Sequence, residues 1–161
     1  MKAIVAIFIL CFAAVSLGQA PAPQLTVKAI SGQITQLGPQ DWAKLPRQHV
    51  RAAGHDGKSH EYEGVNLRDV LTKAGAPTAD TLRGKEMTDY VIAEAADGYR
   101  VVFSVSELDP DFGNQQVLIA DKQDGQPLSA PEGPLRLVVP GEKRQARWVR
   151  MLTTLTVARA P

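Results

Sequence analysis

The fold is decided by the stretch Tyr62-Glu63-Gly64-Val65-Asn66-Leu67-Arg68-Asp69-Val70-Leu71, which leads into Ala74-Gly75. Asn66 is a residue type that caps helices, and an acidic side chain follows three residues later, where it favours the positive end of a helix. The apolar residues that follow fall on one helical face, and Gly75 is suited to end the helix. We therefore predict a helix over 66–74, with Gly64 allowing a tight entry into it.

On both sides of this helix the pattern changes to short strands and turns. Residues 25–30 alternate apolar and polar side chains, as half-buried strands do, and 34–37 predict a second short strand. Asp97-Gly98 separates two strand-like runs and predicts a two-residue hairpin. Further apolar runs predict strands near 117–120, 135–139 and 148–157, and a short helical turn near 106–109. Many short strands with few short helices indicate an α+β domain with a mixed β-sheet core.

The first twenty residues have the pattern of a secretory signal peptide. Lys2 precedes an apolar run over 3–17, and Gly18-Gln19-Ala20 has the small-x-small character of a cleavage site. Cleavage after Ala20 leaves residues 21–161, which we expect to form one domain of ordinary size. We expect this protein to be periplasmic or secreted. No later segment is long and apolar enough to predict a membrane span.

Charge and cysteine content exclude several classes of function. The full chain has 18 basic and 17 acidic side chains and one cysteine. Removal of residues 1–20 takes away Lys2 and Cys11, which leaves 17 of each charge and no cysteine. Disulfides, thiol catalysis, cysteine-bound zinc and iron–sulfur clusters are therefore excluded for the mature chain. A balanced charge also argues against nucleic-acid binding, which favours a basic excess.

From about residue 25 to residue 157 the sequence resembles the molybdopterin-binding domain of the sulfite oxidase family. The resemblance rests on the order and spacing of five segments: 62–71 with Ala74-Gly75, Ala96-Asp97-Gly98-Tyr99, Asp124-Gly125-Gln126-Pro127-Leu128, Gly133-Pro134-Leu135-Arg136-Leu137-Val138-Val139-Pro140-Gly141, and Ala146-Arg147-Trp148-Val149. It implies a compact fold with an irregular β-sheet core, in which a pterin cofactor would lie among loops.

Three residues are candidates for binding such a cofactor. Arg136 and Arg147 lie on or beside strands near Pro140-Gly141, so they could converge on one anionic group, which arginine binds in a fork. His55 falls in the loop that, by the resemblance, would face the cofactor. We predict His55, Arg136 and Arg147 as cofactor-binding residues, assign no catalytic residue, and predict no metal site.

The sequence departs from the family at the metal ligand. Catalytic members of the family ligate molybdenum through a cysteine before the segment that matches 63–65, and Ala52 stands at the corresponding position. The family also has a histidine five residues before the arginine that matches Arg136, and this chain has Pro131 there. The loop from Gly141 to Trp148 is about two residues shorter than the family's loop. Cysteine-ligated molybdenum and conventional oxidoreductase activity are therefore not expected.

Three hypotheses follow. The first is an exported binding or accessory module that holds a small anionic molecule, either molybdopterin or another ligand, near the three predicted residues. The second is an enzyme with a non-thiolate metal site around His55 and His60, since His49, Asp56 and Glu61 lie close in sequence. The third is a structural or protein-interaction domain with no cofactor, and the sequence identifies no redox partner.

Overall fold

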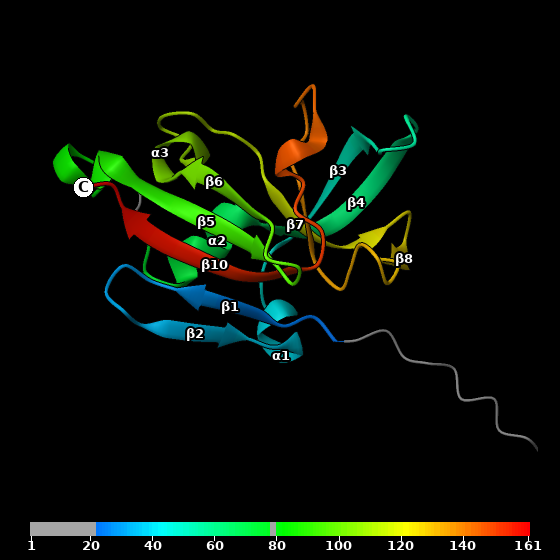
Figure 1. Cartoon of the computed structure of the whole chain (residues 1–161), viewed down its shortest axis with the longest axis horizontal. Coiled ribbons are helices and arrows are strands. Elements are labelled where there is room, and N and C mark those ends of the chain that lie inside the picture. Colours follow the sequence, from blue (N-terminus) through cyan, green and yellow to red (C-terminus); the bar gives the residue numbers. More distant parts are fainter. Residues whose placement is uncertain (1–21, 78–79) are drawn as a thin grey trace, which may run out of the picture.

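The computed structural model describes residues 22–77 and 80–161, and the predicted signal peptide lies outside them. Two five-stranded sheets form the body (Figure 1). The first sheet has the order β2-β1-β10-β5-β6, with bounds β1 (Leu25–Lys28), β2 (Ile34–Leu37), β5 (Asp89–Ala95), β6 (Arg100–Ser104) and β10 (Leu152–Arg159). The second has the order β3-β4-β7-β8 with β9 also paired to β7, and bounds β3 (Arg47–Ala53), β4 (Ser59–Asn66), β7 (Leu118–Gln123), β8 (Gln126–Pro127) and β9 (Arg136–Val138).

Short helices connect the strands. They are α1 (Pro39–Trp42), α2 (Leu67–Lys73), α3 (Val105–Leu108) and the 3-10 helices η1 (Gly84–Thr88) and η2 (Gln145–Arg147). In the first sheet β1 and β10 are parallel and the other pairs antiparallel, so the sheet is mixed. The predicted α+β class with few short helices is confirmed. None of the helices formed by the described residues is long and apolar enough to cross a membrane.

One continuous apolar core joins the two sheets. Val27, Val91 and Leu155 from the first sheet are fully buried, as are Val65 and Ile119 from the second, and all belong to one cluster. Each such side chain contributes roughly 1.5–3 kcal/mol by leaving water. The core therefore fixes the two sheets against each other, and with them the loops at their common end.

The sequence at the junction of β4 and α2 is restricted by a helix cap and by close packing against β7. The Asn66 side chain accepts a hydrogen bond from the Arg68 amide at 2.9 Å, as predicted for the helix cap. A Cβ atom on Gly64 would lie 2.0 Å from the carbonyl oxygen of Ile119, so any side chain there would push β7 away. The pairing of β4 with β7 shifts register at this point.

Two local expectations differ from the structure. Ser59–Asn66 was not predicted as a strand, because its charged side chains break the apolar pattern, yet β4 lies between β3 and β7 and those side chains pair with neighbouring strands. The β5–β6 connection has four residues, 96–99, not two. Ala95 and Tyr99 still bond across it, and Gly98 takes φ +85°, while Asp97 does not adopt the positive φ that a two-residue turn requires.

Candidate functional site

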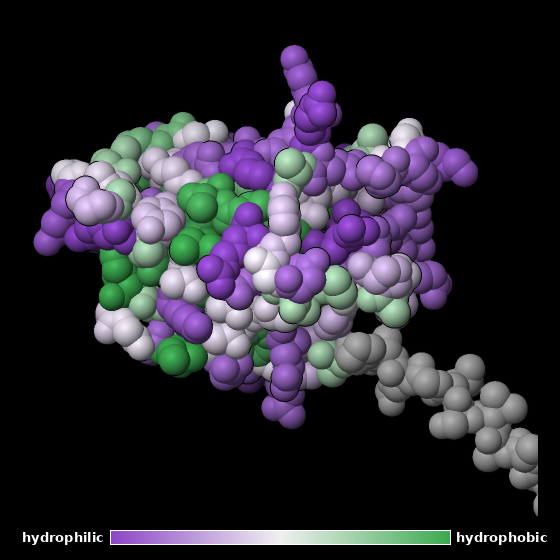
Figure 2. Space-filling model, in the orientation of Figure 1, coloured by the Kyte–Doolittle hydropathy of each residue, from purple (hydrophilic) through white to green (hydrophobic). Residues whose placement is uncertain are grey.

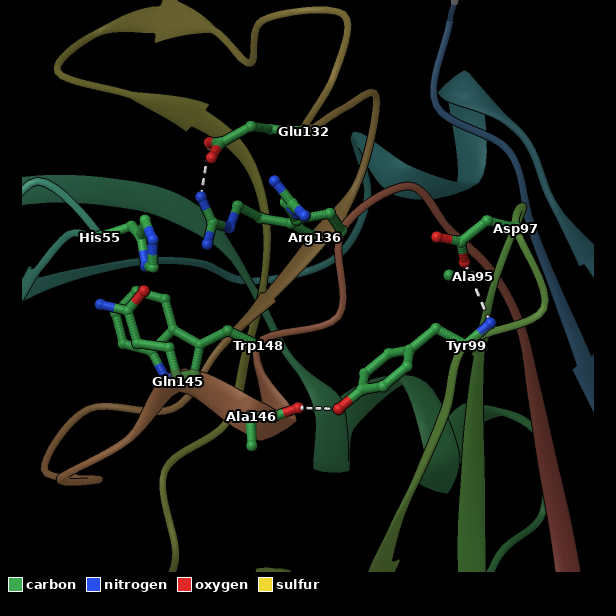
Figure 3. Close-up of a pocket in the computed structure, with 10 residues that line it drawn as sticks. His55, Ala95, Asp97, Tyr99, Glu132, Arg136, Gln145, Ala146 and Trp148 are labelled. Atoms are coloured by element: carbon green, nitrogen blue, oxygen red, sulfur yellow. Dashed lines mark hydrogen bonds and ion pairs between the residues drawn. The ribbon is translucent and has the colours of Figure 1, made fainter.

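A cavity of about 390 Å³ lies at one end of the two sheets, within the size range of small-molecule sites. Both sheets and the loops around β9 and η2 contribute to it (Figure 3). Its lining residues are His55, Ala95, Asp97, Tyr99, Glu132, Arg136, Gln145, Ala146, Trp148 and Arg150. Two of the three predicted residues, His55 and Arg136, therefore line one cavity.

Arg136 is the buried cation of this cavity, with 4% of its surface exposed. Its guanidinium carbon lies 5.5 Å from the ring centre of Tyr62 and 5.4 Å from that of Trp148, within cation–π range. Its Nη1 donates to the carboxylate of Glu132, while its Nε is buried without a hydrogen-bond partner among the described residues. A guanidinium carries five N–H donors, so Arg136 keeps donors beyond the one that Glu132 uses.

The aromatic rings beneath Arg136 form a rigid floor. Tyr62 and Trp148 pack edge to face with centres 5.8 Å apart, and the Trp148 indole donates to the Val139 carbonyl at 3.1 Å. Burial raises the pKa of the Tyr62 phenol above its ordinary value of 10.0, and the Arg136 charge opposes this effect. The phenol therefore stays neutral and the floor adds no negative charge.

Two hydrogen bonds hold the rim formed by η2. The Gln145 side chain donates to the Ala53 carbonyl at 2.5 Å, and the Tyr99 hydroxyl donates to the Ala146 carbonyl at 2.6 Å (Figure 3). The first bond reaches the second sheet and the second reaches the hairpin of the first sheet. The loop before η2 projects from the body and its surface is hydrophilic (Figures 1 and 2), with Lys143 and Arg144 exposed.

The structure does not bring Arg147 to this cavity. Its guanidinium donates to Glu142 at 2.6 Å and to Glu107 at 2.9 Å, and it lies 4.5 Å from the ring centre of Phe103. Partial burial opposes the charge, but the hydrogen bond to Glu142 and the charge of Glu107 outweigh it and raise the pKa of Arg147. Arg147 thus fastens η2 to α3 and positions the rim from outside.

The three histidines lie in different environments. His49 is exposed on β3, with Nδ1 3.6 Å from Glu61. His55 is exposed in the turn that lines the cavity. His60 on β4 bonds Asp124 through Nδ1 at 2.6 Å and Asp56 through Nε2 at 3.1 Å. Over residues 22–77 and 80–161, no three His, Cys, Asp or Glu side chains are grouped so that they could hold a metal ion.

Comparison with known proteins identifies the family. The family model for the oxidoreductase molybdopterin binding domain matches residues 38–161. The chain belongs to this family. A search of curated proteins found no match.

A solved structure supports the same fold. The sulfane dehydrogenase SoxCD from Paracoccus pantotrophus superimposes with a TM-score of 0.64 at 21% identity, covering 83% of this chain. The chain corresponds to 37% of that protein's chain, so the likeness concerns the molybdopterin-binding fold alone.

The cavity fits part of what a molybdopterin-binding domain would need. Arg136 and the exposed Arg150 offer cationic donors, which are suited to anionic oxygens. The metal end does not fit. Ala52 ends its side chain in a methyl group beside the core, paired in register with His60, and Cys11 is the chain's single cysteine. The residues thus suit an anionic group and not a thiolate-bound molybdenum.

Several lining residues were not predicted from sequence. Arg150 was not among the sequence candidates, and Trp148 entered only through the segment 146–149 that carries the family resemblance. Glu132 directly follows Pro131, which stands where the resemblance predicts a histidine, and no pattern in the sequence indicated that its side chain contacts Arg136. Gln145 and Tyr99 act through bonds to backbone carbonyls distant in sequence, which no local pattern indicates.

Proposed function

We propose that this molybdopterin-binding domain holds a small anionic molecule in the cavity, with a phosphate-bearing pterin as one member of that class. Arg136, Arg150 and His55 contact the ligand, and Arg147 positions η2. The observation that carries the proposal is the buried guanidinium of Arg136, which lines the cavity and donates to a single carboxylate, that of Glu132. A guanidinium has five N–H donors, so Arg136 keeps donors that an anionic ligand can use.

We also propose that the domain is not a conventional molybdenum enzyme. A molybdopterin, when bound, supplies metal-centred redox chemistry, but the family's thiolate ligand is replaced by Ala52 and the chain has no cysteine beyond Cys11. The side chains of the cavity bind and orient an anion and offer no recognisable catalytic pair. The role we propose is therefore that of a binding or accessory module, exported by the predicted signal peptide to the periplasm or the medium.

Thermal stabilisation by inorganic phosphate tests the binding proposal. A ligand at ten times its dissociation constant stabilises the folded state by about 1.4 kcal/mol, roughly 3–6 °C in Tm for a domain of this size. We expect this shift in the wild type at constant ionic strength, and its loss in Arg136→Gln and Arg150→Gln. Arg51→Gln is the matched control, because Arg51 is exposed on β3 and does not line the cavity, and it should retain the shift. No shift in the wild type would refute the proposal.

Elemental analysis and absorption spectra test the second part. Protein purified from its native export compartment should contain no stoichiometric molybdenum. Stoichiometric molybdenum would overturn the non-catalytic role, and another stoichiometric metal would favour a site around His55 and His60. N-terminal sequencing of the same sample checks cleavage after Ala20.

A further inference from the structure

We propose that Glu132 is a tethered competitor that makes the Arg136 site selective for tetrahedral oxyanions over monocarboxylates. The inference rests on the proposed anion binding and names the residue that sets its selectivity. Glu132 lines the cavity, and its carboxylate accepts a hydrogen bond from Arg136 Nη1 (Figure 3). One carboxylate of the chain itself thus already lies where a ligand's anionic group would bind.

The backbone of Glu132 is fixed while its side chain is free to leave. Its amide donates to the Ser129 carbonyl at 2.9 Å, and its carbonyl accepts from the Met151 amide at 3.0 Å. Its side chain is 25% exposed, against 5% for that of Arg136. A ligand can therefore displace the carboxylate by a side-chain rotation toward solvent, without moving β9 or the loop that precedes it.

The tether decides which anions can compete. A group held within one chain competes as if present at millimolar or higher concentration. A free monocarboxylate such as acetate would exchange one carboxylate for an equivalent one and gain no hydrogen bond, while losing its translational freedom. It therefore does not displace Glu132 at ordinary concentrations.

A tetrahedral oxyanion gains contacts that Glu132 does not make. It carries more acceptor oxygens and, as phosphate near neutral pH, more charge than a carboxylate. It can accept from the Nη1 of Arg136 that Glu132 gives up and, at the same time, from Arg150, which lines the same cavity. These additional charge-assisted bonds are what offset the displacement of the internal carboxylate.

The charges that line the cavity agree with this selectivity. Two cations, Arg136 and Arg150, face two carboxylates, Asp97 and Glu132, so the cavity carries no net charge before a ligand enters. The Asp97 carboxylate accepts a hydrogen bond from the Tyr99 amide at 3.0 Å and pairs with neither arginine. When the Glu132 side chain turns toward solvent, two cations and one carboxylate remain around the ligand, and the excess positive charge favours an anion.

Glu132→Gln tests the proposal by the ratio of two responses. Melting temperatures are measured with phosphate and with acetate at matched ionic strength in chloride. We expect the wild type to respond to phosphate and not to acetate. The variant should bind phosphate about tenfold more tightly, because the ligand no longer has to displace one charge-assisted hydrogen bond. Its melting temperature should also begin to respond to acetate. Glu94→Gln removes a carboxylate that pairs with Arg100 outside the cavity and should behave as wild type.

The outcomes separate the inference from the binding proposal beneath it. An unchanged phosphate-to-acetate ratio in Glu132→Gln, with phosphate still binding, overturns the role of Glu132 and leaves the anion site in place. No response to phosphate in either protein refutes the anion site itself. If the variant does not fold, the test instead follows the Nε–H resonance of Arg136 in ¹⁵N-labelled wild-type protein during titration with each anion. Phosphate alone should shift that resonance, and an equal shift with acetate overturns the proposal.

Discussion

Arg47 and Arg136 both bind carboxylates at the second sheet, and the contrast between them separates a structural arginine from a binding one. Arg47 uses all three guanidinium nitrogens. Nε and Nη2 donate to Glu63 at 3.1 and 2.7 Å, and Nη1 and Nη2 donate to Asp121 at 2.9 and 2.6 Å. Arg136 is more deeply buried, yet it has one carboxylate partner and a buried Nε with none.

The hydrogen bonds of Arg47 shift the pKa values of the groups in this network. The hydrogen bond to Asp121 is the main cause that raises the pKa of Arg47, and the hydrogen bond from Arg47 lowers the pKa of Glu63. The indole of Trp42 donates to Asp121 at 2.8 Å, which ties α1 to the same network. All three guanidinium nitrogens and four of the five N–H groups donate to these two carboxylates, so the network stabilises the fold and offers little to a ligand.

The largest effect on stability is expected from Arg47→Met. This change leaves Glu63 and Asp121 partly buried without their shared cation, and we expect a loss of roughly 2–3 kcal/mol in the free energy of unfolding. Urea denaturation followed by circular dichroism measures it. The fractional shift in melting temperature caused by phosphate should be unchanged. Loss of this shift in the variant would contradict the assignment of Arg47 as a structural residue and Arg136 as a binding residue.

A smaller loss of stability is expected from Arg136→Met. A similar apolar volume replaces a cation whose Nε is already unsatisfied, and Glu132 can turn to solvent, so we expect a loss of about 1 kcal/mol or less. Urea denaturation under the same conditions gives the comparison. The response to phosphate should disappear completely. A stability loss larger than that of Arg47→Met would assign Arg136 a structural role instead.

The smallest effect concerns the pH dependence contributed by His60. The hydrogen bonds to Asp124 and Asp56 raise the pKa of His60 above 6.5. The backbone amides of Lys58 and Glu61 are the main cause that lowers the pKa values of Asp56 and Asp124 below 3.8, and the hydrogen bonds with His60 lower them further. The histidine's contribution to stability is therefore complete below pH 6.5 and is lost as pH rises through its higher folded value. The carboxyls contribute above pH 3.8 and lose this as pH falls through their lowered values.

His60→Gln tests this window by melting temperature against pH. The difference between wild type and variant should be greatest between about pH 4 and 6.5 and should shrink on both sides. The phosphate response at any one pH should be the same in both proteins, since His60 is not among the residues that line the cavity. A difference that grows above pH 7 would contradict the assigned pairing.

The sequence predicted the parts of the fold that depend on local pattern. The capped helix α2, the strands of the β5–β6 hairpin and the α+β class follow from residues close to one another in the chain. The polar strand β4 was not predicted, because the side chains of His60 and Glu63 form hydrogen bonds with residues up to 64 positions away in the sequence. Separation into two sheets likewise depends on pairings between distant strands.

The same limit applies to the site. His55 and Arg136 were predicted, and the structure places both on one cavity. Arg147 was indistinguishable from Arg136 by sequence, since each follows a loop and precedes apolar residues. What separates them is Glu107, which lies 40 residues before Arg147 and engages it outside the cavity. Whether an arginine lines the cavity therefore depends on its contacts with residues that are distant in the sequence.

The two hydrogen bonds that hold η2 have a consequence for folding kinetics. They join residues 92 and 47 positions apart, Gln145 to Ala53 and Tyr99 to Ala146. Contacts of such long range form only after both sheets have closed their loops, so they belong to the late stage of folding. A ligand seated behind them should slow unfolding and leave the folding rate almost unchanged. No fragment containing one sheet alone would carry the cavity.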